Sequence, residues 1–482
     1  YIISSMATLS SSTPGVRRIL LGVADWNPFP SLLRRFLLFS PGLFFVVSYL
    51  IAISIGTWLL KRPWATKSGS IDWIDALFTS TSAFCVTGLS VVDTGSYFTF
   101  AGQFLIMIMV QVGGLGIMTF AALLFLSIGW TVSMRQRSFI QGTYASDFTH
   151  DIKQLIVFIF AFTFIAEFLG AVLLMPCWGM GPSFRENVFY SVFHSVCSFC
   201  NAGFSLFPDS FVRYRGNVLF IFTVTSLTIL GGIGFPVMRD VIHYLGRTRP
   251  RRLTLNTRIS LVVTVVLIIL GTALFWALES RYSMAGMPWQ DQFLVSYFQS
   301  VSARTAGFYS MDFRVVDNAT LLLFMVLMFI GTSPGSTGGG IKTTSIGVLA
   351  VVAGNRIRGS EANNVFRATL SDEAVTRTIT VFIAAVIFIL LMIFLHMVGQ
   401  QGDAPLNQSR GMFIEYLFEV VSAFGTVGLS TGITPRMDVQ GKLLIIVTMF
   451  VGRVGILTLV YLVAARKHAP SYRYAEENIL IG

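Results

Sequence analysis

Charged residues are scarce in this chain of 482 residues. Only 12% are Asp, Glu, Lys or Arg, whereas 54% are hydrophobic, and the mean hydropathy is +0.72. Soluble domains usually carry about 25% charged residues. The composition therefore excludes an ordinary soluble domain and predicts an integral membrane protein embedded in a lipid bilayer.

Cysteine is also rare, with four in the chain: Cys85, Cys177, Cys197 and Cys200. All four lie in or near apolar segments and lack the spacing of secreted disulfide frameworks. Cys197 and Cys200 form a CxxC pair, but no second ligand pair accompanies it, so zinc or redox chemistry is disfavoured. We expect buried structural thiols.

Signs of catalysis are few. The five histidines are scattered along the chain and no HExxH motif occurs. His194 is expected to be a packed histidine rather than a ligand. We therefore predict that the chain is not an enzyme and holds no cofactor of its own. A structural or receptor subunit without ion flux remains an alternative.

A partial phosphate-loop pattern occurs around Lys342. Gly335, Gly340, Lys342 and Thr343 approach the motif, but Ile341 separates the last glycine from the lysine. The motif also requires a preceding strand, and residues 321–330 are typical of a membrane helix. Nucleotide binding is disfavoured, and Lys342 is expected to mark the cytoplasmic side of a broken helix.

Eight apolar segments are long enough to span a bilayer, and they come in four pairs. Between the members of each pair lies a half-apolar stretch of about a dozen residues, too short to cross. The sequence therefore predicts four repeats of helix, re-entrant half-helix, glycine turn and helix. The eight segments are residues 36–60, 98–129, 152–175, 216–245, 258–280, 316–352, 374–400 and 439–466.

Each half-helix ends in a similar glycine turn. Ten residues before each glycine stands an aromatic residue, and five before it a small one. Four matches in one register indicate an internal repeat. The turns comprise Cys85, Val86, Thr87, Gly88, Cys200, Asn201, Ala202, Gly203, Arg304, Thr305, Ala306, Gly307, Gly425, Thr426, Val427 and Gly428.

Four glycine turns about one axis predict a ring of backbone carbonyls. Such a ring replaces the hydration shell of a potassium ion, and the carbonyl ends of the half-helices favour a cation. None of the four turns contains an acid, which favours a monovalent ion. We expect the ion at the carbonyls of Val86, Asn201, Thr305 and Thr426. Asp93, Asp209 and Asp312 follow the turns and either concentrate cations or only cap loops.

The last helix of each repeat is also rich in glycine, which usually indicates close helix packing. The third repeat differs, because glycines clustered around a proline cannot remain an ordinary helix at membrane depth. We predict a flexible gating loop there, held closed by the intramembrane Arg453. The predicted gate residues are Gly331, Ser333, Pro334, Gly335, Ser336, Thr337, Gly338, Gly339, Gly340, Lys342 and Arg453.

Arg304 lies within the third turn, where a positive charge beside a cation path is costly. We expect its side chain to point backward and tie the half-helices together through acids such as Glu419.

The net charge of +11 does not indicate nucleic acid, because the arginines lie in short stretches between apolar segments. By the positive-inside rule these connections, and both termini, are cytoplasmic in the plasma membrane. We expect the first apolar segment to stay as a membrane helix rather than a cleaved signal peptide, because it is long enough to span a bilayer and lacks a clear cleavage site. The expected regions are 1–35 (N-terminal segment), 36–130, 131–246, 247–353 and 354–470 (four pore repeats) and 471–482 (tail).

These motifs resemble the Trk/Ktr/HKT superfamily of potassium and sodium transporters, most closely its KtrB-type pore subunit. The resemblance covers residues 36–482, and one span precedes the first turn, as in the shorter Ktr type. It rests on the glycine turns, the glycine-rich loop at 333–343, Gly452-Arg453-Val454-Gly455 and the tail at 476–482.

The resemblance implies an all-α pseudo-fourfold pore in each subunit, a homodimer, and a cytoplasmic KtrA-type nucleotide-binding ring that controls the gate. Members with all four filter glycines generally favour potassium. Cys85 and Arg304 differ from the threonine of a standard potassium filter. Two alternatives therefore stay open: a sodium or poorly selective cation pathway, and sodium as a coupling or activating ion.

Overall fold

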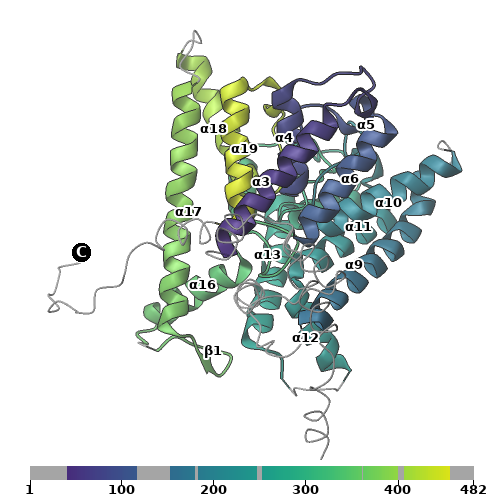
Figure 1. Ribbon diagram of the computed structural model, residues 1–482. Helices are drawn as coiled ribbons and strands as arrows, with labels where there is room; N and C mark the ends of the chain where they lie inside the picture. The colour runs from purple at the N-terminus through teal and green to yellow at the C-terminus, as the bar shows by residue number, and fades with distance from the viewer. Residues whose placement is uncertain are drawn as a thin grey trace, which may run out of the picture.

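The computed structural model describes residues 41–116, 152–179, 183–246, 252–360, 362–399 and 406–455. Helices dominate these ranges (Figure 1). The only strands within them form one small hairpin, in which β1 (Asn364–Val365) pairs antiparallel with β2 (Ala368–Thr369). The predicted N-terminal segment, the tail at 471–482 and both termini lie outside the described residues.

One order of helices occurs four times along the chain, and we call each occurrence a unit. A long first helix is followed by a half-helix, a turn and a second helix. The first helices are α3 (Pro41–Leu60), α9 (Ile152–Leu174), α13 (Leu255–Glu279) and α17 (Asp372–Gly399). The half-helices are α4 (Trp73–Phe84), α10 (Phe184–Cys200), α14 (Trp289–Ser302) and α18 (Leu406–Gly425). The second helices are α6 (Phe100–Leu115), α11 (Val218–Ile233), α15 (Asn318–Phe329) and α19 (Val439–Val454).

The remaining helices connect or extend these units. The α-helices among them are α5 (Thr94–Tyr97), α12 (Phe235–Leu245) and α16 (Thr343–Ile357). The short 3₁₀ helices are η1 (Pro63–Ala65), η2 (Met175–Trp178), η3 (Val212–Tyr214), η4 (Phe313–Val315) and η5 (Thr434–Arg436).

Each second helix begins on a capping side chain. Thr99, Asn217, Asp317 and Asp438 each accept a hydrogen bond from a backbone N–H of the first turn of α6, α11, α15 and α19, respectively. Such a side chain satisfies a backbone donor that has no partner within the helix. The same device therefore restarts the chain as a helix after each turn.

Three described helices are long and apolar enough to cross a membrane: Gln154–Trp178, Leu255–Glu279 and Asp372–Gly399. The helices α11 and α12 together also qualify, but they are bent by 99° at a short break. Residues 216–245, which the sequence predicts as one membrane-spanning segment, therefore form two helices at an angle. Gly234 stands at the bend with a φ of 94°, a left-handed conformation that ends the helix.

The second helices of units one and four end in the same way. Gly116 and Gly455 follow α6 and α19 with φ of 82° and 84°. In unit three, α15 ends at Phe329 and α16 begins at Thr343, so this helix is interrupted where the sequence predicts a break. The second helices of units one, two and four thus each end at a glycine with a positive φ, whereas α15, with 12 residues against 16, ends earlier in its unit.

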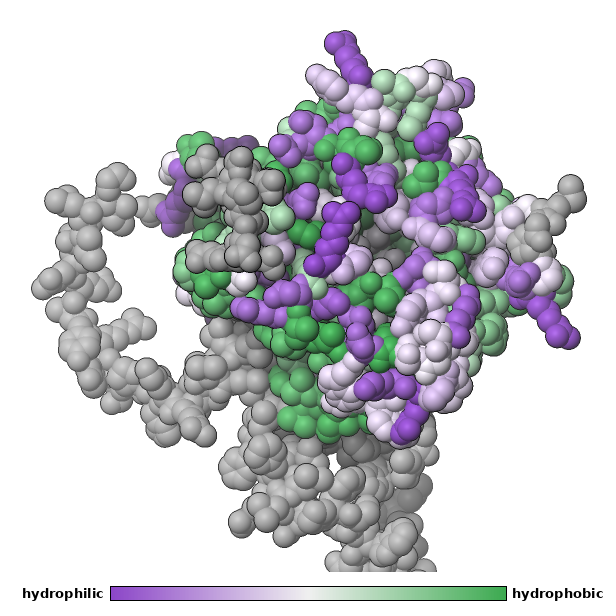
Figure 2. All heavy atoms as spheres, turned by 90° about the horizontal axis from the view of Figure 1, so that it is seen from above, coloured by the Kyte–Doolittle hydropathy of each residue, from purple (hydrophilic) through white to green (hydrophobic). Residues whose placement is uncertain are grey.

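Many polar side chains are buried inside the molecule, and many large apolar ones are exposed on its outside. Thr79, Ser80, Thr81 and Ser82 of α4 are all buried, whereas Phe168 of α9 is 67% exposed. Figure 2 shows one end of the molecule, with hydrophilic residues over much of its middle and hydrophobic residues along parts of the rim. This distribution is typical of a protein whose sides face lipid and whose interior holds polar backbone.

Candidate functional site

The four turns share one backbone conformation. Val86, Asn201, Thr305 and Thr426 have φ between 49° and 76°, a region that side chains other than glycine seldom adopt. Two residues later Gly88, Gly203, Gly307 and Gly428 have φ between 66° and 97°. Each turn therefore has two residues with positive φ, separated by one residue, and the second of the two is always glycine.

The turns contact one another in a closed ring. A Cβ atom at Gly88 would overlap the carbonyl oxygen of Ala202, and one at Gly203 would press on that of Ala306. In the same sense, a Cβ at Gly307 would overlap the carbonyl oxygen of Val427, and one at Gly428 that of Thr87. Every glycine thus leaves space for the next turn, and the fourth turn meets the first.

Hydroxyl groups of the half-helices hold the turns. In units one and four the serine six residues before the glycine, Ser82 or Ser422, accepts a hydrogen bond from that glycine's N–H, at 3.0 and 3.1 Å. In unit three, Ser302 instead donates to the carbonyl of Phe308. The third turn is therefore held differently from the first and fourth.

The glycines of the second helices allow close packing, as the sequence indicates. A Cβ at Gly113, Gly231 or Gly452 would overlap the carbonyl oxygen of Phe84, Phe199 or Phe424, respectively, near the end of the half-helix of the same unit. In units one, two and four the second helix therefore lies directly against the half-helix that leads into the turn.

The glycine-rich loop between α15 and α16 lies against the turns. A parallel bridge joins Ile330 to Ile341, and the N–H of Gly331 donates to the carbonyl of Ile341 at 2.9 Å. The N–H of Gly339 donates to Oγ1 of Thr426 in the fourth turn at 3.0 Å. A Cβ at Gly338 would overlap Oγ1 of Thr305 in the third turn. The loop therefore packs directly against the ring of turns.

The same loop also packs against the second unit. The N–H groups of Ser333 and Thr337 donate to the carbonyls of Gly232 and Gly231 at 3.0 and 3.2 Å. The N–H of Phe235 in turn donates to the carbonyl of Gly335 at 3.0 Å. The bend between α11 and α12 thus coincides with a docking surface for the loop.

Arg453 of the fourth unit joins the loop to the first unit. Its guanidinium donates to the carbonyls of Thr337 in the loop and Gly113 in α6, and its Nε lies 3.4 Å from the hydroxyl oxygen of Tyr49 in α3. Lys342 reaches back into the loop, where its Nζ donates to the carbonyl of Gly338 at 2.9 Å. Both cations are therefore held by backbone carbonyls of the loop or its neighbours.

The expected contact between Arg304 and Glu419 is absent. Glu419 accepts hydrogen bonds through Oε1 from Ser430 and from Thr434, and Arg304 makes no ion pair within the described ranges. Arg304 is 6% exposed. The carboxylate instead holds the segment after its own turn, because Ser430 and Thr434 supply hydroxyl donors close in the chain.

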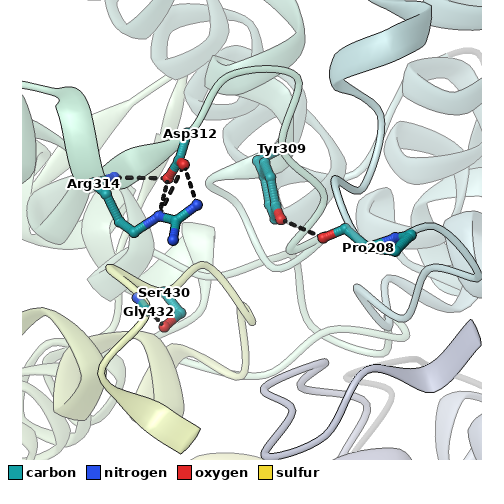
Figure 3. Close-up of polar contacts among 6 residues, drawn as sticks. All are labelled: Pro208, Tyr309, Asp312, Arg314, Ser430 and Gly432. Carbon is teal, nitrogen blue, oxygen red and sulfur yellow. Dashed lines mark hydrogen bonds and ion pairs between the residues drawn. The ribbon is translucent and has the colours of Figure 1, made fainter. Parts of the chain in front are cut away.

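The three acids after the turns are engaged locally. Asp93 caps α5, accepting from Ser96 N–H at 2.6 Å, and Asp209 pairs with Arg213 at 2.9 Å. Asp312 pairs with Arg314 at 2.6 Å (Figure 3). That guanidinium lowers the pKa of the Asp312 carboxyl below its usual range. These interactions favour a role in capping the loops.

Segments that follow or precede the turns also join neighbouring units. The hydroxyl of Tyr309 donates to the carbonyl of Pro208 at 3.2 Å, which joins units two and three (Figure 3). The side chain of Arg314 lies close to Gly432, which joins units three and four. Lys442 of α19 pairs with Asp75 of α4 at 2.6 Å, which joins units four and one. These contacts between units thus follow the ring order of the turns.

One functional candidate was not predicted from the sequence. Glu167 of α9 is 6% exposed and lies behind the second turn, where its Oε2 accepts from Nε2 of Gln111 at 3.2 Å. The thiol of Cys200 donates to Oε1 of Gln111 at 3.6 Å. The sequence does contain a signal for this residue. Glu167 is the one acid inside the apolar segment 152–175, and acids at such depth are usually functional.

The described residues give no catalytic constellation. Two GxSxG pentapeptides occur, at Gly331 to Gly335 and at Gly428 to Gly432, but neither lies on the strand-to-helix turn that such a nucleophile requires. Ser333 contacts the hydroxyl of Thr343, and no His/Cys/Asp/Glu cluster suited to a metal occurs in the described ranges. His194 is buried and packed parallel to Phe207, with ring centroids 5.1 Å apart.

Comparison with known proteins places these features in a family. The sequence model of the TrkH family, described as a cation transport protein, matches residues 37–477. Among curated relatives, the potassium/sodium uptake protein NtpJ of Enterococcus hirae is 37% identical over 92% of this chain and 97% of its own. The Ktr system potassium uptake protein B of Vibrio alginolyticus is 36% identical over 91% and 94%.

A solved structure shares the fold. The potassium transporter TrkH from Vibrio parahaemolyticus aligns with a TM-score of 0.66 and 19% identity, over 88% of this chain and 84% of that one. Together with the family match over nearly the whole chain, these similarities confirm the resemblance seen in the sequence. The chain belongs to the TrkH family of membrane cation transport proteins.

Proposed function

We propose that this protein takes up potassium across the plasma membrane through the ring of four turns. The closed ring of glycine contacts carries the proposal, because each turn holds the same left-handed alternation and meets its neighbours. Rings of backbone carbonyls select potassium by replacing its hydration shell. The carbonyls of Val86, Asn201, Thr305 and Thr426 are the proposed ligands, and potassium is the substrate rather than a cofactor.

The proposed architecture is four pore repeats, eight membrane spans and a pseudo-fourfold axis through the ring. The repeats occupy residues 36–130, 131–246, 247–353 and 354–470, and both termini are cytoplasmic. The fourfold order of helices and the apolar outer surface support this proposal. The C-terminal ends of α4, α10, α14 and α18 lead into the turns, so their helix dipoles favour a cation there.

The glycine-rich loop is the proposed gate. It contacts Thr305 and Thr426 of the turns and is held by Arg453 from the fourth unit. We further propose a homodimer and control of this gate by a cytoplasmic nucleotide-binding ring. The relative from Vibrio alginolyticus is named as protein B of a Ktr system, which supports a partner subunit.

A sodium or poorly selective pathway is the second candidate, favoured by the similarity to a protein named for both potassium and sodium uptake. Ion flux into proteoliposomes under potassium, rubidium and sodium gradients separates the two. We expect potassium and rubidium to enter and sodium to be largely excluded. Sodium flux equal to potassium flux would favour the second candidate, and no flux of any cation would overturn both.

A further inference from the structure

A basic cavity lies at the end of the molecule that carries the hairpin. It has a volume of about 540 Å³ between the start of α13 and the turn between β1 and β2. In Figure 1 the hairpin, α12 and α16 lie together at this end. The lining residues are Arg252, Leu253, Leu255, Arg258, Phe366, Arg367 and Ala368.

The hairpin turn is shaped to present two of these residues. Phe366 and Arg367 are the two residues between the paired strands, and their φ values are 50° and 65°. Two successive left-handed residues form the tight turn that matches the twist of a hairpin, although glycine or asparagine usually supplies them. Nη1 of Arg258 lies 3.5 Å from the carbonyl oxygen of Phe366, which ties this turn to α13.

The cavity is positively charged. Three of its lining residues are arginines, none is an acid, and these three arginines make no ion pair within the described ranges. The carboxylate of Asp240 is held beside the cavity, where its Oδ2 accepts from both the N–H and the hydroxyl of Thr254 at 2.9 Å, so one acid borders three arginines. Arginine binds phosphate well because its planar donors can make two parallel hydrogen bonds.

An apolar surface continues from the cavity along α13. Val262, Val265 and Ile269 follow Arg258 at helical spacing on the same face, and they are 48%, 53% and 60% exposed. Leu253, Leu255 and Phe366 add apolar surface to the cavity itself. Phosphate-binding side chains therefore border directly on a surface suited to hydrocarbon chains.

We propose that this cavity binds the phosphate headgroup of an anionic phospholipid, whose acyl chains lie along the exposed face of α13. The inference rests on the membrane orientation of the proposed function, which places this end at the cytoplasmic leaflet. Basic pockets between membrane helices on that side suit anionic headgroups. Ile259, Val348 and Leu370 pack together beside the cavity, so the lipid borders on α16, the helix that continues the gating loop.

The test is a titration of lipid into the purified full-length protein in neutral detergent. The melting temperature of the protein is measured at each lipid concentration. We expect dioctanoyl-phosphatidylglycerol to raise the melting temperature saturably, and dioctanoyl-phosphatidylcholine and inorganic phosphate not to do so. Arg258→Gln and Arg367→Gln should each weaken the apparent affinity about fivefold. Arg213→Gln, at an exposed arginine outside the cavity, is the matched control and should leave the affinity unchanged.

Several outcomes would overturn the proposal. Unaltered affinity in both cavity variants places the lipid elsewhere, and an equal shift with inorganic phosphate assigns the cavity to a soluble anion. No response to phosphatidylglycerol excludes the lipid and leaves an acidic protein surface as the occupant. If Arg258→Gln does not fold, Arg367→Gln at the exposed turn decides the question. The titration measures no flux, so its failure is distinct from failure of the transport proposal.

Discussion

The guanidinium of Arg453 donates a hydrogen bond to the carbonyl of Thr337, which joins the last helix to the glycine-rich loop. The same side chain donates to the carbonyl of Gly113 in the first unit. Arg453 occupies the position of Gly114 and Gly232 in the related motifs Gly113 to Gly116 and Gly231 to Gly234. Of the three units that share this motif, only the fourth therefore has a side chain at this position that can reach the loop.

Replacing Arg453 with alanine should release the loop and raise basal potassium uptake. A hydrogen bond from a charged donor contributes about 1.5–3 kcal/mol, so we expect an increase of roughly tenfold in proteoliposome flux. Arg281→Ala is the control variant, because it removes the same charge at an exposed arginine between α13 and α14, away from the loop. If the Arg453 variant folds and its flux matches that of the wild type, the proposed role of Arg453 is wrong.

The ion pair of Lys442 with Asp75 should stabilise the contact between the fourth and first units. Their side chains are only 13% and 17% exposed, so Lys442→Met leaves a partly buried carboxylate without its partner. We expect a loss of about 1–3 kcal/mol, measured as a lower melting temperature. The exposed pair of Arg213 and Asp209 provides the comparison, and Arg213→Ala should cost less than about 1 kcal/mol.

The double variant Asp75→Lys with Lys442→Asp tests whether the charge pair itself matters. It should recover part of the melting temperature lost in Lys442→Met. Equal melting temperatures for the wild type and Lys442→Met would show that packing alone holds the two units together.

Asp312 should keep its contribution to stability in mildly acidic solution. Arg314 lowers the pKa of this carboxyl in the folded protein, so the unfolded protein binds the proton more tightly. The stabilisation is therefore complete above the unfolded pKa of about 3.9 and is lost as the pH falls through the lower folded value. The melting temperatures of the wild type and Asp312→Asn should differ by a constant amount between about pH 7 and pH 5.

A difference that already disappears in that interval would contradict this account of Asp312. Arg314→Ala serves as the matched variant, because it removes the cause of the lowered pKa. In that variant the contribution of the carboxylate should be lost at a higher pH than in the wild type.

The recurring order of helices could be predicted from the sequence because its signal is local. A glycine at a fixed distance after an aromatic and a small residue marks each turn, and the clustered glycines around Pro334 mark the interrupted third helix. The bend at Gly234 could not be recognised in the same way, since Gly231-Gly232-Ile233-Gly234 is equally typical of a continuous helix that packs closely. The loop docks on Gly231 and Gly232 beside this bend, and that contact joins segments about 100 residues apart.

Contacts of charged side chains were harder to predict because they join distant parts of the chain. Lys442 and Asp75 are 367 residues apart, and no local pattern relates them. The expected partner of Arg304 was wrong for a related reason, since Glu419 finds nearer hydroxyl donors in Ser430 and Thr434. The position of Arg453 was more informative, because a charge at that depth in an apolar helix requires partners.

Gly307 provides the most direct test of the ring. Its φ is 77°, and a Cβ there would overlap the carbonyl oxygen of Val427 in the next turn. Gly286 has a φ of 84° but nothing within 4 Å of the same position. Alanine at either site costs about 1–2 kcal/mol of backbone strain, so the pair isolates the contact between turns.

The decisive measurement is potassium and sodium flux into proteoliposomes for the wild type, Gly307→Ala and Gly286→Ala. We expect the wild type and Gly286→Ala to take up potassium in strong preference to sodium. Gly307→Ala should lose potassium uptake by more than about tenfold or lose its preference over sodium, because the carbonyl ring is displaced. Unchanged potassium uptake and selectivity in a folded Gly307→Ala protein would contradict the assignment of the four turns as the selectivity filter.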